Sequence, residues 1–237
     1  YTVLFTPSVD GAYNINVAAG AFTDSAGNNN TAATQFSWTM DTTGPIMTIT
    51  AAEVSSGDTS SNGSLSLTFS SNETPSGFAE TDIVITSAGA GTGTISSFAG
   101  SGSTYTATFT PSANDTYTIT VGTGTFIDAF GQSNSAASFT WIYDTVQPTM
   151  AITASGASAV SSGDTTNDAT LNIAFVSSKT TTDFVAGDIS ITNLAGTTIT
   201  GAISSFTGSN KNYSAIFTPP SNDTYTITVA VNTFTDG

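Results

Sequence analysis

YTATFTP, at residues 105–111, has two near-copies in the chain, YTVLFTP at 1–7 and YSAIFTP at 213–219. Successive copies begin 104 and 108 positions apart. Each copy alternates apolar residues with Thr or Ser, the period of two that is typical of a β-strand with one buried face. A repeat of roughly a hundred residues is too long for a solenoid unit and has the size of an independently folding domain.

Other segments recur at similar spacing. They are YNINV at 13–17 with YTITV at 117–121 and 225–229, FSWTMD at 36–41 with FTWIYD at 139–144, and LSLTF at 65–69 with LNIAF at 171–175. Clusters of Gly, Asn, Asp and Pro separate these alternating stretches, and no segment shows a helical period with caps. About seven short strands per hundred residues predict an all-β fold of two-sheet sandwiches.

The position of a tyrosine narrows the type of sandwich. Tyr117 and Tyr225 each follow an Asn-Asp-Thr turn and begin an alternating strand. This is the place of the tyrosine corner of immunoglobulin-like domains, in which the hydroxyl bonds back to nearby backbone. Two residues further on, where an antibody domain has Cys, the chain has Ile119 and Ile227. Packing therefore replaces the disulfide.

The repeats divide the chain into tandem immunoglobulin-like β-sandwich domains in an extended array. Residues 45–147 are predicted to be a complete domain. Residues 1–44 correspond to strands E, F and G of a preceding domain, and residues 148–237 to a domain that lacks its last strand. We expect the chain to be a window on a longer array. Trp38 and Trp141 alternate in phase with neighbouring Phe residues, so both are predicted to be buried.

Composition excludes several classes of function. The chain has 17 acidic residues against two lysines, Lys179 and Lys211, and its net charge is −15. So few cations cannot neutralise a row of phosphates, so we expect neither nucleic-acid binding nor docking on an anionic membrane. The sequence has no Cys and no His, which excludes thiol and imidazole chemistry. No cleft-forming insertion is visible, no apolar run is long enough to span a membrane, and we expect no enzyme.

The pattern SSGDT…LSLTFSSNET…TDIVIT…GSGSTYTATFTP…FTWIYDT resembles bacterial immunoglobulin-like repeats. Such repeats build giant surface adhesins and biofilm-associated proteins. The resemblance covers the whole chain. It implies an extracellular or cell-surface stalk of many tandem domains, whose partners are the neighbouring repeats, and it implies calcium bound between neighbours.

One acidic position recurs in the predicted F–G loop, as Asp24, Asp128 and Asp236. One interpretation is a simple turn, in which the Asp accepts a local backbone bond and Gly27 or Gly131 supplies a positive φ. The other makes the Asp a calcium ligand, because hard cations prefer carboxylate oxygens. The spacing of acidic residues is not that of an EF-hand loop.

Two short linkers, DTTGP at 41–45 and DTVQP at 144–148, join the last strand of one repeat to the first strand of the next. Proline restricts itself and the residue before it, so the connection is predicted to be stiff and extended.

In the immunoglobulin lettering, the complete repeat has predicted strands B at 65–69, C at 83–86, F at 117–121 and G at 139–143. The topology brings the linker, the B–C loop and the F–G loop to one end of the sandwich. For the first linker this gathers Asp41, Glu73 and Asp128, with Asp82 nearby. Crowded carboxylates repel, and a calcium ion would resolve the repulsion and tie two domains together. The alternative is that the carboxylates are splayed in solvent.

The second linker differs in one position. When the two repeats are aligned so that Phe78 matches Phe184, Lys179 of the later repeat matches Glu73 of the earlier one. We expect the Lys179 ammonium, with Asp144 and Asp236, to replace the metal at that linker. The alternative is that Lys179 points to water.

The leading interpretation is a structural spacer or stalk repeat of a secreted or cell-surface adhesin, filament or surface-layer protein. Other copies of the same protein are a further possible class of partner. The alternative is a ligand-binding or glycan-binding fibre module, viral fibres included. Phe130 is the one loop aromatic without a repeat counterpart, and we expect it to pack beside Met40 and the first linker.

Overall fold

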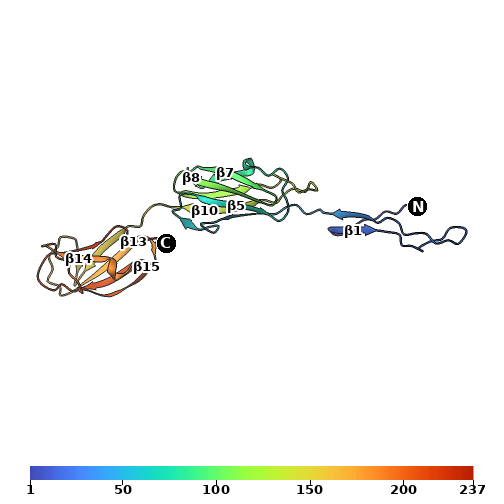
Figure 1. Cartoon of the computed structure of the whole chain (residues 1–237). Coiled ribbons are helices and arrows are strands. Elements are labelled where there is room, and N and C mark those ends of the chain that lie inside the picture. Colours follow the sequence, from blue (N-terminus) through green and yellow to red (C-terminus); the bar gives the residue numbers. More distant parts are fainter. Residues whose placement is uncertain (237) are drawn as a thin grey trace. The chain divides into compact units, whose positions relative to one another are not determined.

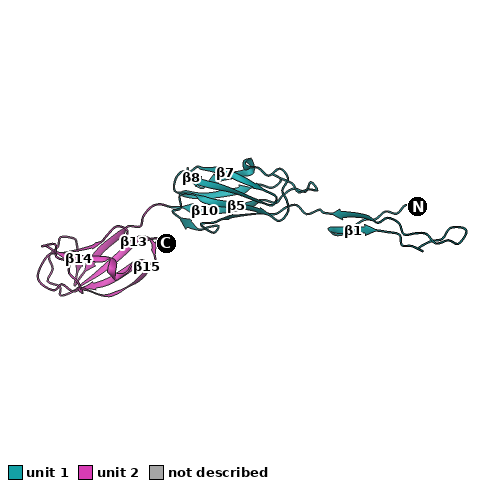
Figure 2. Cartoon of the chain, in the orientation of Figure 1, with its two compact units in different colours: residues 1–144 teal, residues 145–237 magenta. Residues whose placement is uncertain are grey.

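The computed structural model describes residues 1–236, and these form two compact units, residues 1–144 and residues 145–236 (Figure 2). Within the described residues, both units are built from β-strands, with only one turn of 3₁₀-helix in each, Glu80–Asp82 and Ala186–Asp188. The predicted all-β class is confirmed. Among the described residues, no helix has the length and apolar character needed to cross a bilayer.

Unit 1 contains a sandwich of two four-stranded sheets (Figure 1). The first sheet has the order β3 (Met47–Ala51), β5 (Leu65–Ser71), β8 (Thr104–Pro111), β7 (Gly93–Ser101). The second has the order β4 (Thr59–Ser60), β10 (Ala137–Tyr143), β9 (Asp115–Val121), β6 (Ile83–Ser87). All neighbours are antiparallel except β4 and β10, which run parallel. This is the immunoglobulin-like arrangement, and β7 is a strand that the repeats alone had not revealed.

The core of this sandwich is aromatic. Trp141 and Phe109 are fully buried, and their rings meet edge to face with centroids 6.0 Å apart. Tyr117 is equally buried, and its hydroxyl donates to the carbonyl of Ala113 at 2.7 Å. The corresponding bond joins Tyr225 to Ser221 at 2.8 Å. The predicted tyrosine corner is therefore confirmed, and burial of Trp141 is confirmed with it.

The N-terminal part of unit 1 is a hairpin of β1 (Gly11–Ile15) and β2 (Phe36–Met40). Trp38 stacks on Tyr13 at a ring distance of 5.1 Å but remains partly exposed, and Phe36 is 63% exposed. Burial of Trp38 was therefore predicted wrongly. Among the described residues, no second sheet faces this two-stranded hairpin, so Trp38 packs only on neighbouring rings such as Tyr13 and Phe5 and is not covered.

Unit 2 repeats this plan. One sheet has the order β12 (Ala159–Val160), β11 (Met150–Ser155), β13 (Leu171–Thr181), β15 (Ile203–Phe217), and the other pairs β14 (Ile189–Asn193) with β16 (Tyr225–Val229). Its core has the same chemistry, with Phe175, Phe184 and Phe217 at most 3% exposed. The matching 3₁₀ turns are capped alike, because Asp82 accepts from the amide of Ala79 and Asp188 from that of Val185, both at 2.8 Å.

Candidate metal centre

The segment that enters the sandwich of unit 1 is held by backbone contacts. The carbonyl of Pro45 accepts from the Ser135 amide at 3.2 Å, and the Ile46 amide donates to the side chain of Asn72 at 2.6 Å. Gly44 lies so close to Ser133 that a Cβ there would be 2.0 Å from the Ser133 carbonyl oxygen. The loop between β5 and β6 and the loop between β9 and β10 thus both contact the connecting segment.

The F–G loop is folded around Asp128. Its Oδ1 accepts from the amides of Phe130 at 2.7 Å and Gln132 at 2.8 Å, and Gly131 has a φ of 88°. The turn interpretation is confirmed for this oxygen. The other oxygen, Oδ2, is buried and has no hydrogen-bond partner, and the Asp128 side chain as a whole is only 3% exposed. A buried carboxylate oxygen without a donor is costly unless a cation or proton satisfies it.

Three carboxylates converge at this point. One oxygen each of Asp41, Glu73 and Asp128 lies within 4.8 Å of the others. Asp41 comes from the connecting segment and accepts from the Thr43 amide at 3.1 Å, and Glu73 follows the end of β5. The two side chains are partly buried. The structure thus places together three of the four acidic residues that the sequence singled out.

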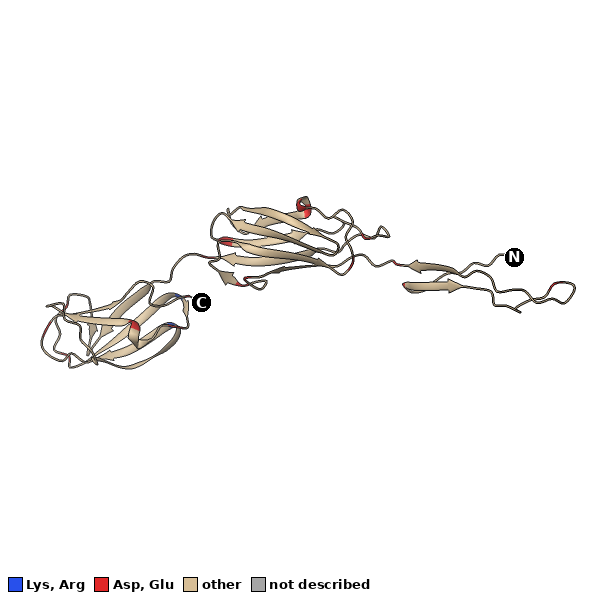
Figure 3. Ribbon diagram, in the orientation of Figure 1, with Lys and Arg blue, Asp and Glu red and all other residues tan. Residues whose placement is uncertain are grey.

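Electrostatics at the cluster are unfavourable. Burial, followed by the negative charges of Asp41 and Asp128, raises the pKa of Glu73 above its ordinary value. Unit 1 contains eleven of the 17 acidic residues and neither lysine. No side-chain cation of unit 1 is therefore present to offset the repulsion, and Figure 3 shows red acidic positions scattered along an otherwise uncharged ribbon.

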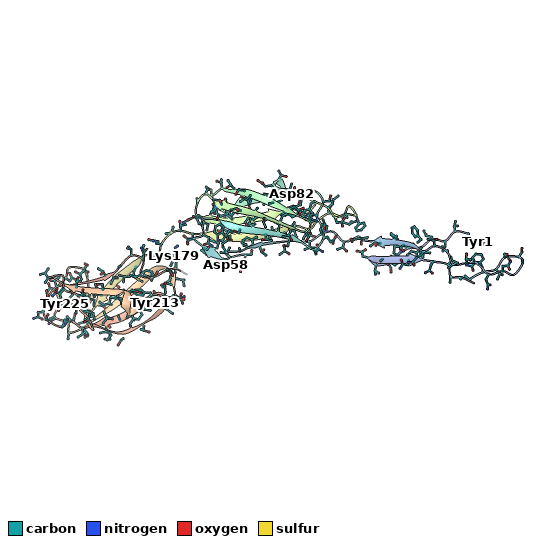
Figure 4. The ribbon with its side chains drawn as sticks, in the orientation of Figure 1. Tyr1, Asp58, Asp82, Lys179, Tyr213 and Tyr225 are labelled. Atoms are coloured by element: carbon teal, nitrogen blue, oxygen red, sulfur yellow. The ribbon has the colours of Figure 1, made fainter. Side chains whose placement is uncertain are left out.

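Two residues lie elsewhere than expected. Asp82 is outside the group of three and caps the 3₁₀ turn before β6 (Figure 4). Phe130 is 58% exposed, so the prediction that it packs beside Met40 is wrong. The backbone amides of Phe130 and Gln132 both donate to Asp128, and the turn that these bonds hold leaves Phe130 largely exposed.

A family model described as "Bacterial Ig-like domain" matches residues 41–141. This range contains the three carboxylates and all of both sheets except the last two residues of β10. Residues 41–141 are a bacterial Ig-like domain. The predicted resemblance to bacterial immunoglobulin-like repeats is thereby confirmed for this part of the chain.

A search of curated proteins found no match. Among solved structures, the chain is similar to surface layer protein SbsC, domains 4–9, with 15% sequence identity and a TM-score of 0.29. The match covers 95% of this chain and 34% of that one, so the chain spans about a third of the length of this relative.

Unit 2 has a different arrangement at the position of the carboxylate cluster. The Lys179 ammonium forms an ion pair with Asp236 at 2.6 Å and also donates to the carbonyl of Val146. Asp144, the third residue predicted there, is the last residue of unit 1.

One residue that shapes the loop of the candidate site was missed from the sequence. Asn134 is 1% exposed. Its side-chain oxygen accepts from the Phe126 amide at 3.1 Å, and its side-chain nitrogen donates to the carbonyls of Gly122 at 2.7 Å and Ser135 at 2.8 Å. It thereby closes the loop that carries Asp128. Asn30 precedes Asn134 by the same number of residues as Tyr13 precedes Tyr117. The recurrence of Asn at this position of the repeat was the signal available in the sequence.

Proposed function

We propose that the chain is a structural spacer of a secreted or cell-surface protein, such as an adhesin, filament or surface-layer protein. The bacterial Ig-like match and the repeated sandwiches support this proposal. The alternative of a glycan-binding fibre module stays a prediction.

Within this proposal, the carboxylate cluster of unit 1 binds calcium. The single observation that carries the site is the orphaned Oδ2 of Asp128, buried beside two further carboxylates. No described group donates a hydrogen bond to this oxygen. A buried carboxylate oxygen in this state is stabilised only by a bound cation or a proton.

The ligands fit a hard divalent cation such as calcium. All three are hard carboxylate oxygens, which suit Ca²⁺ and Mg²⁺ and exclude metals that need imidazole or thiolate. Ligand oxygens on opposite sides of a calcium ion are roughly 5 Å apart, whereas those around magnesium are about 4 Å apart at most. The three oxygens lie within 4.8 Å of one another, a separation that a calcium ion can bridge.

Bound calcium would connect three elements. Asp41 belongs to the connecting segment, Glu73 to the loop after β5, and Asp128 to the loop between β9 and β10. A cation shared by these carboxylates replaces their mutual repulsion with attraction, and so holds the connecting segment against the sandwich. This makes the connection stiff, which is what a spacer requires.

Calcium titration of the full chain tests the proposal. Isothermal calorimetry is expected to show binding, with slower hydrogen exchange in residues 41–46, and magnesium is expected to bind at least tenfold more weakly. Glu73→Gln removes one charged ligand and is expected to weaken calcium binding at least tenfold. Glu80→Gln is the matched control, because Glu80 is exposed on the 3₁₀ turn of the same unit. Absence of binding heat and of any exchange response at millimolar calcium would remove the metal site from the proposal.

A further inference from the structure

Unit 2 carries a cation where unit 1 carries a carboxylate. The backbone positions are equivalent, because the Glu73 amide faces the Ser71 hydroxyl at 3.4 Å and the Lys179 amide faces the Ser177 hydroxyl at 3.3 Å. Both serines are buried in equivalent strands of the two units: Ser71 is the last residue of β5, and Ser177 lies in β13, which continues to Thr181. The structure therefore confirms that Glu73 and Lys179 start from the same place in the fold.

The Lys179 ammonium makes contacts like those expected of the metal in unit 1. It pairs with Asp236 of the F–G loop at 2.6 Å and donates to the carbonyl of Val146 in the connecting segment. The pair is partly shielded, with side-chain exposures of 24% for Lys179 and 34% for Asp236. Figure 4 shows Lys179 in unit 2. One cation thus joins the connecting segment to the loop.

A second contact shows that the loop of unit 2 is organised by its own side chains. The carboxylate of Asp183 accepts from the Thr235 amide at 2.9 and 3.0 Å and from the Thr235 hydroxyl at 2.8 Å. In unit 1, Gly77 occupies the position of Asp183, and the loop is held there by a pair of backbone bonds between Ser76 and Ile127.

We propose that Lys179 is a built-in replacement for the metal ion, so that the residue at this one position decides whether a repeat requires calcium. In unit 2 the ammonium neutralises Asp236 and holds the connecting segment without metal. In unit 1 the carboxylate of Glu73 adds a negative charge instead and makes the site depend on an external cation. The unit 1 half of this inference rests on the proposed function.

The unit 2 half is tested by hydrogen exchange on the full chain. Lys179→Met removes the ammonium and keeps a flexible apolar stem. Exchange in residues 145–149 and 234–236 is expected to rise about tenfold, the loss of one charge-assisted bond, and calcium is expected not to slow it in either the wild type or the variant. Lys211→Met removes the same charge from the same unit and is the control, because Lys211 donates to the carbonyl of Ser178 and leaves the Asp236 pair in place.

The reverse exchange tests unit 1. Glu73→Lys is expected to abolish calcium binding and, in metal-free buffer, to slow exchange in residues 41–46 relative to the metal-free wild type. Glu80→Lys adds the same charge elsewhere in the unit and is expected to change neither quantity.

The outcomes separate this inference from the proposed function. If the wild type binds no calcium, the proposed metal site is refuted. The role of Lys179 is still tested by hydrogen exchange in Lys179→Met and in metal-free Glu73→Lys. Equal exchange in Lys179→Met and Lys211→Met would overturn it. So would slowing of residues 145–149 by calcium in the wild type, or faster exchange of residues 41–46 in metal-free Glu73→Lys.

Discussion

Gly44 is the point at which the connecting segment can be loosened without touching a metal ligand. In Gly44→Ala the new Cβ would lie 2.0 Å from the oxygen and 3.0 Å from the carbon of the Ser133 carbonyl. Both obstacles are backbone atoms, so no side-chain rotation relieves the clash. The connecting segment must move away from the loop between β9 and β10.

The magnitude has two independent estimates. Overpacking of this kind costs about 1–3 kcal/mol. Complete detachment of the segment would break the bonds Ser135 N–H to Pro45 O, Ile46 N–H to the Asn72 side chain and Asn72 N–H to Ile46 O. At about 1 kcal/mol each, this loss is about 3 kcal/mol. We expect unit 1 to lose about 2 kcal/mol of unfolding free energy.

Urea unfolding followed by tryptophan fluorescence measures this change, because Trp38 and Trp141 both lie in unit 1. Faster exchange of the Ser135 and Asn72 amides would locate the damage, and weaker calcium binding is expected because Asp41 moves with the segment. Gly63→Ala is the control, since a Cβ at Gly63 meets nothing within 4 Å. If both variants unfolded at the same urea concentration with equal calcium affinity, the argument that close approach at Gly44 fixes the segment would be refuted.

Three further predictions use the same chain. Phe139→Ala is expected to destabilise unit 1 by about 3–5 kcal/mol in thermal or urea unfolding, because Phe139 is only 2% exposed. Phe36→Ala, at the matching repeat position, should cost under about 0.5 kcal/mol, because Phe36 is 63% exposed. Equal losses of stability would contradict this difference in packing. Asn134→Ala removes three hydrogen bonds to the backbone, one of them to the buried Phe126 amide, and at about 1 kcal/mol each it is expected to cost about 3 kcal/mol by urea unfolding. A change within experimental error would mean that water replaces the side-chain amide. Hydrogen bonds from the Thr235 amide and the Thr181 hydroxyl lower the pKa of Asp183 in the folded protein. The Asp183 carboxylate therefore stabilises unit 2 fully above its pKa in the unfolded chain, which is about 4. This stabilisation is lost as the pH falls through the lower pKa of the folded state. Amide exchange of unit 2 between pH 6 and 3 is expected to show this loss in the wild type and a smaller one in Asp183→Asn; identical pH profiles would count against it.

The repeated alternation was enough to predict the sandwich and most of its strands. It missed β7, and it wrongly predicted a strand at residues 1–7, which lack the partner strands of a complete sheet. A period of two with β-branched and aromatic residues encodes a half-buried strand locally, and the tyrosine after an Asn-Asp-Thr turn encodes a local bond four residues back. Both signals depend on short stretches of chain, which is why Tyr117 and Trp141 lie where they were expected. The positions of Asp41, Glu73 and Asp128 at one end of the sandwich also followed, because immunoglobulin-like topology determines which loops share an end.

Burial depends on what faces a strand, and sequence alternation does not contain that information. Trp38 and Trp141 occupy the same repeat position, yet only Trp141 has a second sheet against it. Phe130 is exposed because the Asp128 carboxylate sets the direction of its loop. The unpartnered Oδ2 of Asp128 and the ion pair of Lys179 with Asp236 are likewise products of side-chain geometry in three dimensions. Sequence alone therefore determined most of the strands and the residues available at the candidate site, whereas only the tertiary structure decided which of their atoms are buried, paired or left without a partner.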